Sequence, residues 1–149
     1  QKNRTLQQKQ IQTDKCIFLS EGLTEFFLDK DLETRSKYMD IQLVEAVMKN
    51  IKKIDPRISR IVIRAHPTES SDKFSHLVSM YPEFIAVSKS NVELTEELRN
   101  FGIAIGYQSM ALVIALKMGL RVVSVKFKEM RDIVLPFEEI ERFVFTNEV

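Results

Sequence analysis

The segment RAHPTE at positions 64–69 carries residue types that bind phosphate, directly after an apolar, β-branched stretch. The imidazole of His66 can bind an anion when protonated, or donate one hydrogen bond to a phosphate oxygen when neutral. Pro67 fixes φ and prevents a strand from continuing, so His66 is expected where the strand ends. Arg64 and Glu69 flank this pair, and Glu69 can touch a hydroxylated ligand. The alternative is a histidine that only forms a hydrogen bond within its loop, and position alone leaves both open.

A second segment, GYQS at positions 106–109, has the pattern of a turn between a strand and an apolar helix. Gly106 allows a close backbone approach. Gln108 and Ser109 lie at the expected start of the helix, where free N–H groups and the helix dipole favour an anion. Ser109 can add a hydroxyl donor. The alternative is that Ser109 is a plain N-terminal cap, and the two roles are compatible.

A third segment, SEG at positions 20–22, follows the first apolar stretch of the chain. Gly22 permits a tight turn. Glu21 is a candidate for contact with a sugar or ribose hydroxyl, with Ser20 beside it. For a single carboxylate in such a position, a solvated loop is the more common role.

Several other functional classes are disfavoured. The chain has neither a Walker loop nor a Gly-x-Gly-x-x-Gly fingerprint, which argues against a tightly bound nucleoside triphosphate or NAD. One cysteine and two histidines argue against a structural zinc site, and no metal is expected. The net charge is +1 with scattered basic residues, so nucleic acid is not an expected partner. The longest apolar run, 111–120, is too short for a membrane span of about 20 residues.

Composition indicates one globular domain in a reducing compartment. A length of 149 residues, with 44% hydrophobic and 29% charged residues, is ordinary for a folded α/β domain. The single cysteine, Cys16, fits a cytoplasmic protein because it excludes an internal disulfide framework. Residues 1–15 are polar and glutamine-rich and are predicted to be a linker or flexible segment. The folded domain is therefore expected over 16–149.

The elements that must position the three segments follow from hydrophobic patterning. Short, wholly apolar stretches alternate with stretches of helical spacing, which is typical of a parallel sheet covered on both faces. We predict a Rossmann-like, three-layer α/β/α domain with a mainly parallel sheet of about five strands. Ligands of such sheets bind outside the carboxyl ends of the strands, where all three segments fall. Strands are predicted over 16–19, 60–65, 84–87, 102–105 and 121–125, and helices over 34–54, 72–80, from 91 and over 110–118, with a small helix near 137–142.

Residues 17–125 resemble the C-terminal, donor-binding half of GT-B glycosyltransferases. The likeness is to bacterial enzymes of capsule and lipooligosaccharide synthesis, including the sialyltransferase-like group. Three stretches carry it: IFLSEGLTE at 17–25, IVIRAHPTE at 61–69 with its His-Pro pair, and IGYQSMAL at 105–112 followed by ALKMG at 115–119.

The resemblance implies a role for each candidate residue. The His-Pro histidine, here His66, contacts the donor phosphate and assists departure of the nucleotide, and Ser109 also contacts phosphate. Preorganised donors aimed at a leaving group that gains negative charge lower the barrier, so no cofactor is needed beyond the nucleotide-sugar substrate. The implied phosphate site holds His66, Pro67, Gly106, Gln108 and Ser109; the implied nucleotide and sugar site holds Ser20, Glu21, Gly22, Arg64 and Glu69.

The resemblance also implies what the chain works with. Sialyltransferase-like enzymes often have two serines at the later turn, whereas Gln108 precedes Ser109 here, which argues against a CMP-sialic acid donor. The catalytic base of these enzymes lies in the N-terminal half. The chain is therefore expected to be the donor-binding part of a glycosyltransferase, with an N-terminal GT-B half on the same chain as its partner. Peripheral association with the inner face of the membrane is left open.

Two alternatives to the glycosyltransferase reading remain. A nucleotide-sugar 2-epimerase half shares this architecture and requires additional acid and base carboxylates in the cleft. A non-catalytic ligand-binding or interaction module would use the same pocket without turnover.

Overall fold

The computed structural model describes residues 13–22, 32–70, 72–89 and 91–146, with the backbone alone for 32–38. Most of the predicted N-terminal linker, 1–12, lies outside the described residues. So does the end of the first stretch that carries the family resemblance, at 23–25.

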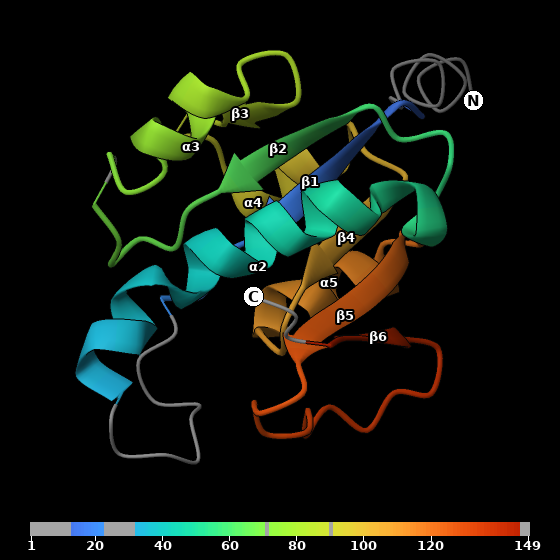
Figure 1. Ribbon diagram of the computed structural model, residues 1–149. Coiled ribbons are helices and arrows are strands. Elements are labelled where there is room, and N and C mark those ends of the chain that lie inside the picture. Colours follow the sequence, from blue (N-terminus) through green and yellow to red (C-terminus); the bar gives the residue numbers. More distant parts are fainter. Residues whose placement is uncertain (1–12, 23–31, 71, 90, 147–149) are drawn as a thin grey trace.

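Six parallel strands form one sheet in the order β3-β2-β1-β4-β5-β6 (Figure 1). From β1, the next two strands are added on one side of the sheet, and β4, β5 and β6 are added on the other side. This change of side between β1 and β4 is typical of a doubly wound Rossmann-like sheet. The predicted fold class is thus confirmed, with one strand more than expected. The strands are β1 (Lys15–Leu19), β2 (Arg60–Arg64), β3 (Ile85–Val87), β4 (Ile103–Gly106), β5 (Arg121–Phe127) and β6 (Glu141–Phe145).

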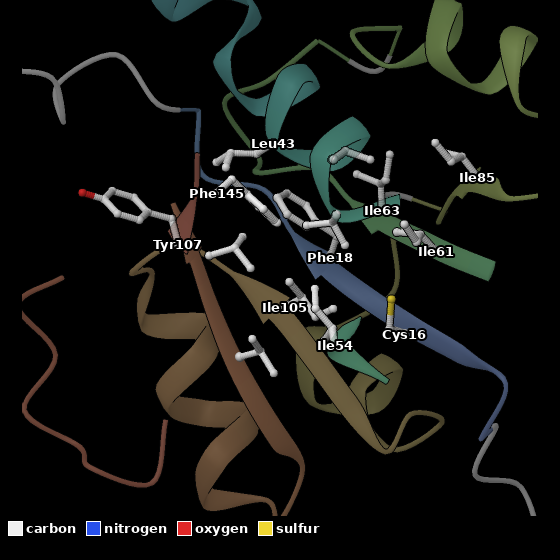
Figure 2. Close-up of a cluster of buried hydrophobic side chains, with 14 of the residues drawn as sticks. Cys16, Phe18, Leu43, Ile54, Ile61, Ile63, Ile85, Ile105, Tyr107 and Phe145 are labelled. Carbon is white, nitrogen blue, oxygen red and sulfur yellow. The ribbon is translucent and has the colours of Figure 1, made fainter. Parts of the chain in front are cut away.

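Helices cover both faces of the sheet. One hydrophobic cluster joins α2 and α3 to one face, and a second joins α4 and α5 to the other. The side chains of β1 after Lys15 are all apolar because both faces of the strand are covered. Cys16 and Phe18 enter the first cluster (Figure 2), and Ile17 and Leu19 enter the second. The helices are α2 (Leu32–Ile54), α3 (Ser75–Met80), α4 (Leu94–Leu98) and α5 (Met110–Lys117).

Two helices begin later than predicted. The stretch 72–74 forms a turn, in which the carbonyl of Asp72 accepts hydrogen bonds from the N–H and the hydroxyl of Ser75, and α3 starts only there. Helix α4 starts at Leu94, not at Asn91. Helix α5 ends at Lys117, one residue before the predicted end, and Gly119 follows with φ +93°, a left-handed conformation that suits glycine.

The predicted small helix near 137–142 is wrong. Residues 141–145 instead form β6, which pairs in parallel with β5 from Val123 opposite Glu141 to Phe127 opposite Phe145. The aromatic rings of Phe143 and Phe145 lie 5.2 Å apart. Aromatic and β-branched residues favour a strand where they can pack across a sheet, and this packing outweighs the short helical pattern.

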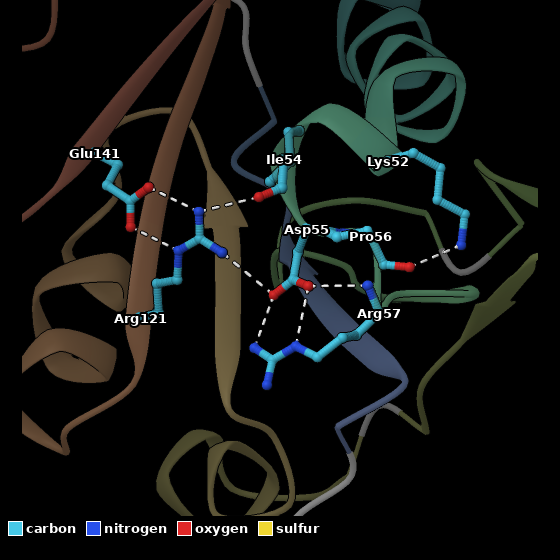
Figure 3. A network of polar contacts seen from close by, with 7 residues as sticks. All are labelled: Lys52, Ile54, Asp55, Pro56, Arg57, Arg121 and Glu141. Atoms are coloured by element: carbon cyan, nitrogen blue, oxygen red, sulfur yellow. Dashed lines mark hydrogen bonds and ion pairs between the residues drawn. The ribbon is translucent and has the colours of Figure 1, made fainter.

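The amino end of the sheet is tied by an ionic network around Asp55 (Figure 3). Asp55 follows α2, is 3% exposed, and accepts hydrogen bonds from Arg57 at 3.0 and 3.1 Å and from Arg121 at 3.2 Å. Arg121, the first residue of β5, also binds Glu141, the first residue of β6. The network therefore joins α2 to β5 and β6 at the amino ends of the strands, opposite the carboxyl ends where the candidate site lies.

Candidate functional site

The three predicted segments meet at the carboxyl edge of the sheet. Leu19, the last residue of β1, is paired with Arg64 of β2 on one side and Gly106 of β4 on the other. The N–H of Ser20 extends the pairing to the carbonyl of Arg64 at 3.0 Å. The SEG segment therefore lies between the His-Pro loop and the start of α5, at the point where strand order reverses, which is where sheets of this kind bind ligands.

The His66 side chain is exposed and oriented by its own loop. Its Nδ1 lies 2.7 Å from the hydroxyl of Thr68 and accepts the Thr68 N–H at 3.2 Å. Because Nδ1 accepts, the proton of the neutral imidazole is assigned to Nε2. The ring is thus set to offer an N–H donor at the surface of the loop, which is the role that phosphate binding requires.

Glu69 holds the His-Pro loop in place. Its Oε1 accepts the N–H of His66 at 2.7 Å, and its Oε2 accepts the hydroxyl of Ser20 at 3.0 Å. The ammonium of Lys73 bonds to the same Oε2 and also to Asp40, a 1% exposed side chain of α2, at 2.7 Å. Both carboxylate oxygens of Glu69 are therefore engaged within the protein, and its contact with a donor sugar stays a prediction.

Charge pairing stabilises this network. Burial alone would lower the pKa of Lys73, but its hydrogen bonds to Asp40 and Glu69 outweigh burial and raise the pKa above its usual value. Lys73 is consequently a permanent cation between two carboxylates. Local spacing pairs Lys73 with Glu69, four positions earlier, but does not indicate the second partner, because Asp40 lies 33 positions away.

Arg64 is tied to the segment that precedes and forms α4. Its Nη1 donates to the carbonyl of Val92 and to the carboxylate of Glu97, each at 2.8 Å. Glu97 is buried, so this pair fixes the end of β2 against α4. The predicted ligand contact of Arg64 would have to come from its other guanidinium nitrogens.

A cavity of about 200 Å³ lies at the carboxyl ends of β2 and β3. Its walls carry the imidazole of His66 and the cationic side chains of Arg64 and Lys89, and Val87 adds an apolar surface. The mixture suits a small anion beside a flat or apolar group. The lining residues are Arg64, Ala65, His66, Pro67, Glu69, Val87, Ser88 and Lys89.

Glu21 points away from Glu69 and toward the amino end of α5. Its Oε2 accepts the N–H of Tyr107 at 3.1 Å and the N–H of Gln108 at 2.6 Å. Burial and, to a smaller extent, the charge of Asp40 raise the pKa of Glu21, the backbone N–H groups partly oppose the rise, and the net value is about 7. The carboxylate thus occupies amides that the sequence analysis assigned to a phosphate.

The turn before α5 is shaped by close packing. A Cβ on Gly106 would lie 3.1 Å from the carbonyl oxygen of Leu19 and 3.3 Å from the Leu112 side chain, so glycine is needed for strand packing. Gln108 turns its side chain to the connection after β5, where its Oε1 accepts the N–H of Val134 at 3.2 Å. The predicted donor contact of Gln108 is therefore limited to its backbone.

Ser109 stands at the N-cap position of α5 with φ −72° and ψ 158°, but its side chain makes no capping hydrogen bond. Its Oγ is buried and has no hydrogen-bond partner within the described residues. A buried hydroxyl without a partner is costly, and its contact with a donor phosphate stays a prediction. The plain capping role is not what the structure shows.

The buried side chain of Tyr107 supports the turn before α5, and the sequence analysis did not identify it. It is 1% exposed, its hydroxyl donates to the carbonyl of Arg131, and its own carbonyl accepts the Ser124 hydroxyl at 2.5 Å. Burial, followed by the charge of Glu21, raises the pKa of Tyr107 to about 12. Its large apolar ring in a segment of small and polar residues was the available signal.

Two further properties bear on the chemistry. Across the described ranges, no group of three or more His, Cys, Asp or Glu side chains could hold a metal ion. In the same part of the chain, no helix has the length and apolar character that crossing a membrane requires.

Likeness to known proteins is found in the structure and not in the sequence. No protein-family model and no curated protein sequence matches the chain. Among solved structures, the chain is similar to KpsC of Thermosulfurimonas dismutans, a beta Kdo 2,4 transferase, with a TM-score of 0.52 and 9% identity. The match covers 87% of this chain and 38% of the other. The chain therefore has the parallel, Rossmann-like α/β fold of one part of that transferase.

Proposed function

We propose that the chain is the donor-binding domain of a nucleotide-sugar-dependent glycosyltransferase of bacterial surface polysaccharide synthesis. The observation that carries the proposal is His66, whose Nδ1 is engaged by Thr68 so that Nε2 carries the proton, and which lines a cavity together with Arg64 and Lys89. The fold of a Kdo transferase, shared over most of the chain, supports the same class of reaction. The domain would act in the cytoplasm, with an acceptor-binding half on the same chain.

The chemistry asked of this domain is stabilisation of a leaving group. As the bond between sugar and phosphate breaks, negative charge grows on the nucleotide phosphate. The Nε2–H of His66 would donate to a phosphate oxygen, and the buried Oγ of Ser109 would donate to another. Such preorganised donors are worth about 2.7–4 kcal/mol each where removal has been measured. The base that activates the acceptor would come from the other half.

Calorimetric titration with sugars linked to CMP, UDP, GDP and CDP tests the proposal. At least one donor should bind, and His66→Ala should weaken it about tenfold, as expected for the loss of one hydrogen bond to a charged phosphate. The matched control is His76→Ala, because His76 is the only other histidine, is exposed on α3 and does not line the cavity.

The donor-binding proposal fails if no donor binds. It also fails if His66→Ala binds donors as tightly as the wild type and His76→Ala do. If a UDP-N-acetylhexosamine binds and is epimerised by the chain, the epimerase alternative replaces it.

A further inference from the structure

The amino end of α5 already holds an anion that belongs to the protein. The Glu21 carboxylate accepts the N–H groups of Tyr107 and Gln108, at 3.1 and 2.6 Å. These N–H groups and the adjoining start of α5 are where a Rossmann-like sheet places a ligand phosphate. The two anions cannot use the same amides together.

The neighbouring hydroxyl of Ser109 indicates that this site suits a ligand other than the Glu21 carboxylate. The Oγ of Ser109 is buried and makes no hydrogen bond within the described part of the chain, although a carboxylate lies on the two preceding amides. Glu21 therefore satisfies the backbone of the turn and leaves its side-chain donor unused. A tetrahedral anion has more acceptor oxygens than a carboxylate and can engage both kinds of donor.

We propose that Glu21 is an internal occupant of the anion site at the amino end of α5, and that a bound phosphate displaces it from the Tyr107 and Gln108 amides. The inference rests on the proposed donor site, because the phosphate is that of the nucleotide-sugar. Glu21 would then leave its buried position as the donor enters. Glu21 accepts the N–H groups of the turn while no phosphate is bound, and it is displaced each time a donor binds.

The charges around Glu21 make it an occupant that is easy to displace. Asp40 of α2 repels the carboxylate, and on the side of the turn Glu21 interacts electrostatically with Tyr107. Arg131 and Asp132, from the connection after β5, act at Tyr107 with opposite signs. Burial and Asp40 disfavour the ionised form in place. Moving Glu21 into water relieves this penalty, so its pKa should fall when the site is filled.

Sulfate is the probe for the displacement, because it stays a dianion across the working pH range and needs no nucleotide pocket. In the wild type, the ¹³C carboxyl resonance of Glu21, assigned by comparison with Glu21→Gln, should titrate near pH 7. Saturating sulfate should move the midpoint down toward the ordinary value of about 4.3. The ¹⁵N–¹H signals of Tyr107 and Gln108 should shift in the same titration.

Affinity provides the second readout. Glu21→Ala removes the occupant and should bind sulfate at least about tenfold more tightly than the wild type at pH 8, because the two charge-assisted hydrogen bonds of Glu21 no longer have to be broken. Glu96→Ala is the matched control, since Glu96 is exposed on α4. Amide spectra of both variants establish that the fold is retained.

An unchanged or raised midpoint with sulfate overturns the proposal, as does equal sulfate affinity of the wild type and Glu21→Ala. These outcomes are separate from failure of the donor site. A protein that binds no nucleotide-sugar but releases Glu21 to sulfate refutes the proposed function alone. A protein that binds a donor while Glu21 stays on its amides refutes the displacement alone.

Discussion

Replacing Glu69 measures how firmly the His-Pro loop is held. Its carboxylate makes three contacts, with the N–H of His66, the hydroxyl of Ser20 and the ammonium of Lys73. Glu69→Gln keeps one acceptor oxygen for His66 but turns an amide toward the other two donors. With about 1 to 1.5 kcal/mol for each lost hydrogen bond to a charged group at a partly exposed loop, the variant should lose about 2 kcal/mol of unfolding free energy. Glu69→Ala, which loses all three, should lose about 3 kcal/mol.

Urea denaturation followed by circular dichroism is the assay. With a slope of about 2 kcal/mol/M for a domain of this size, the midpoint should fall by about 1 M for Glu69→Gln and about 1.5 M for Glu69→Ala. Glu96→Gln, at an exposed position on α4, is the control and should leave the midpoint unchanged. A shift below about 0.2 M in Glu69→Ala would refute the reasoning that this carboxylate holds the loop.

Three further substitutions test other contacts. Gly106→Ala should cost about 1 to 3 kcal/mol in urea denaturation, because its Cβ would lie 3.1 Å from the carbonyl oxygen of Leu19. The hydrogen bond from Arg57 lowers the pKa of Asp55, so the stability that Asp55 adds is present above the unfolded-state pKa of about 4 and is lost as pH falls through the folded value. Asp55→Asn should therefore lower the urea midpoint at pH 7, and its gap from the wild type should narrow below about pH 4. Ser109→Ala should leave stability within about 0.5 kcal/mol, since its buried hydroxyl has no partner in the described ranges, yet weaken donor binding about tenfold in calorimetry.

Much of the fold was predictable because the strands of a two-sided sheet are apolar on both faces. The alternation of apolar strands and helical segments predicted the Rossmann-like class and the first five strands. Strand β6 was not predicted, since its sequence, ERFVF, has exposed charged residues at one end and only becomes a strand by pairing with β5. Short segments at a sheet edge depend on such pairing more than on their own pattern.

The place of the candidate site was also predictable, but its internal contacts were not. The rule that ligands bind at the carboxyl ends of parallel strands brought three segments together. The partners Ser20 and Glu69 are 49 positions apart, and Glu21 and Tyr107 are 86 apart. No local pattern shows which way each of two adjacent side chains, Ser20 and Glu21, turns. That choice decided which loop each one holds.

The size of the cavity beside His66 has a kinetic consequence. At about 200 Å³ it lies below the roughly 300–1,000 Å³ of pockets that enclose most of a small ligand. A nucleotide-sugar held there keeps much of its surface in water, so a dissociation constant on the order of 1 mM is expected for the domain alone. With an association rate constant of about 10⁷ M⁻¹s⁻¹, the residence time would be about 0.1 ms. Donor exchange on this domain would then be far faster than typical enzymatic turnover. Long occupancy would require a second protein surface that covers the bound donor.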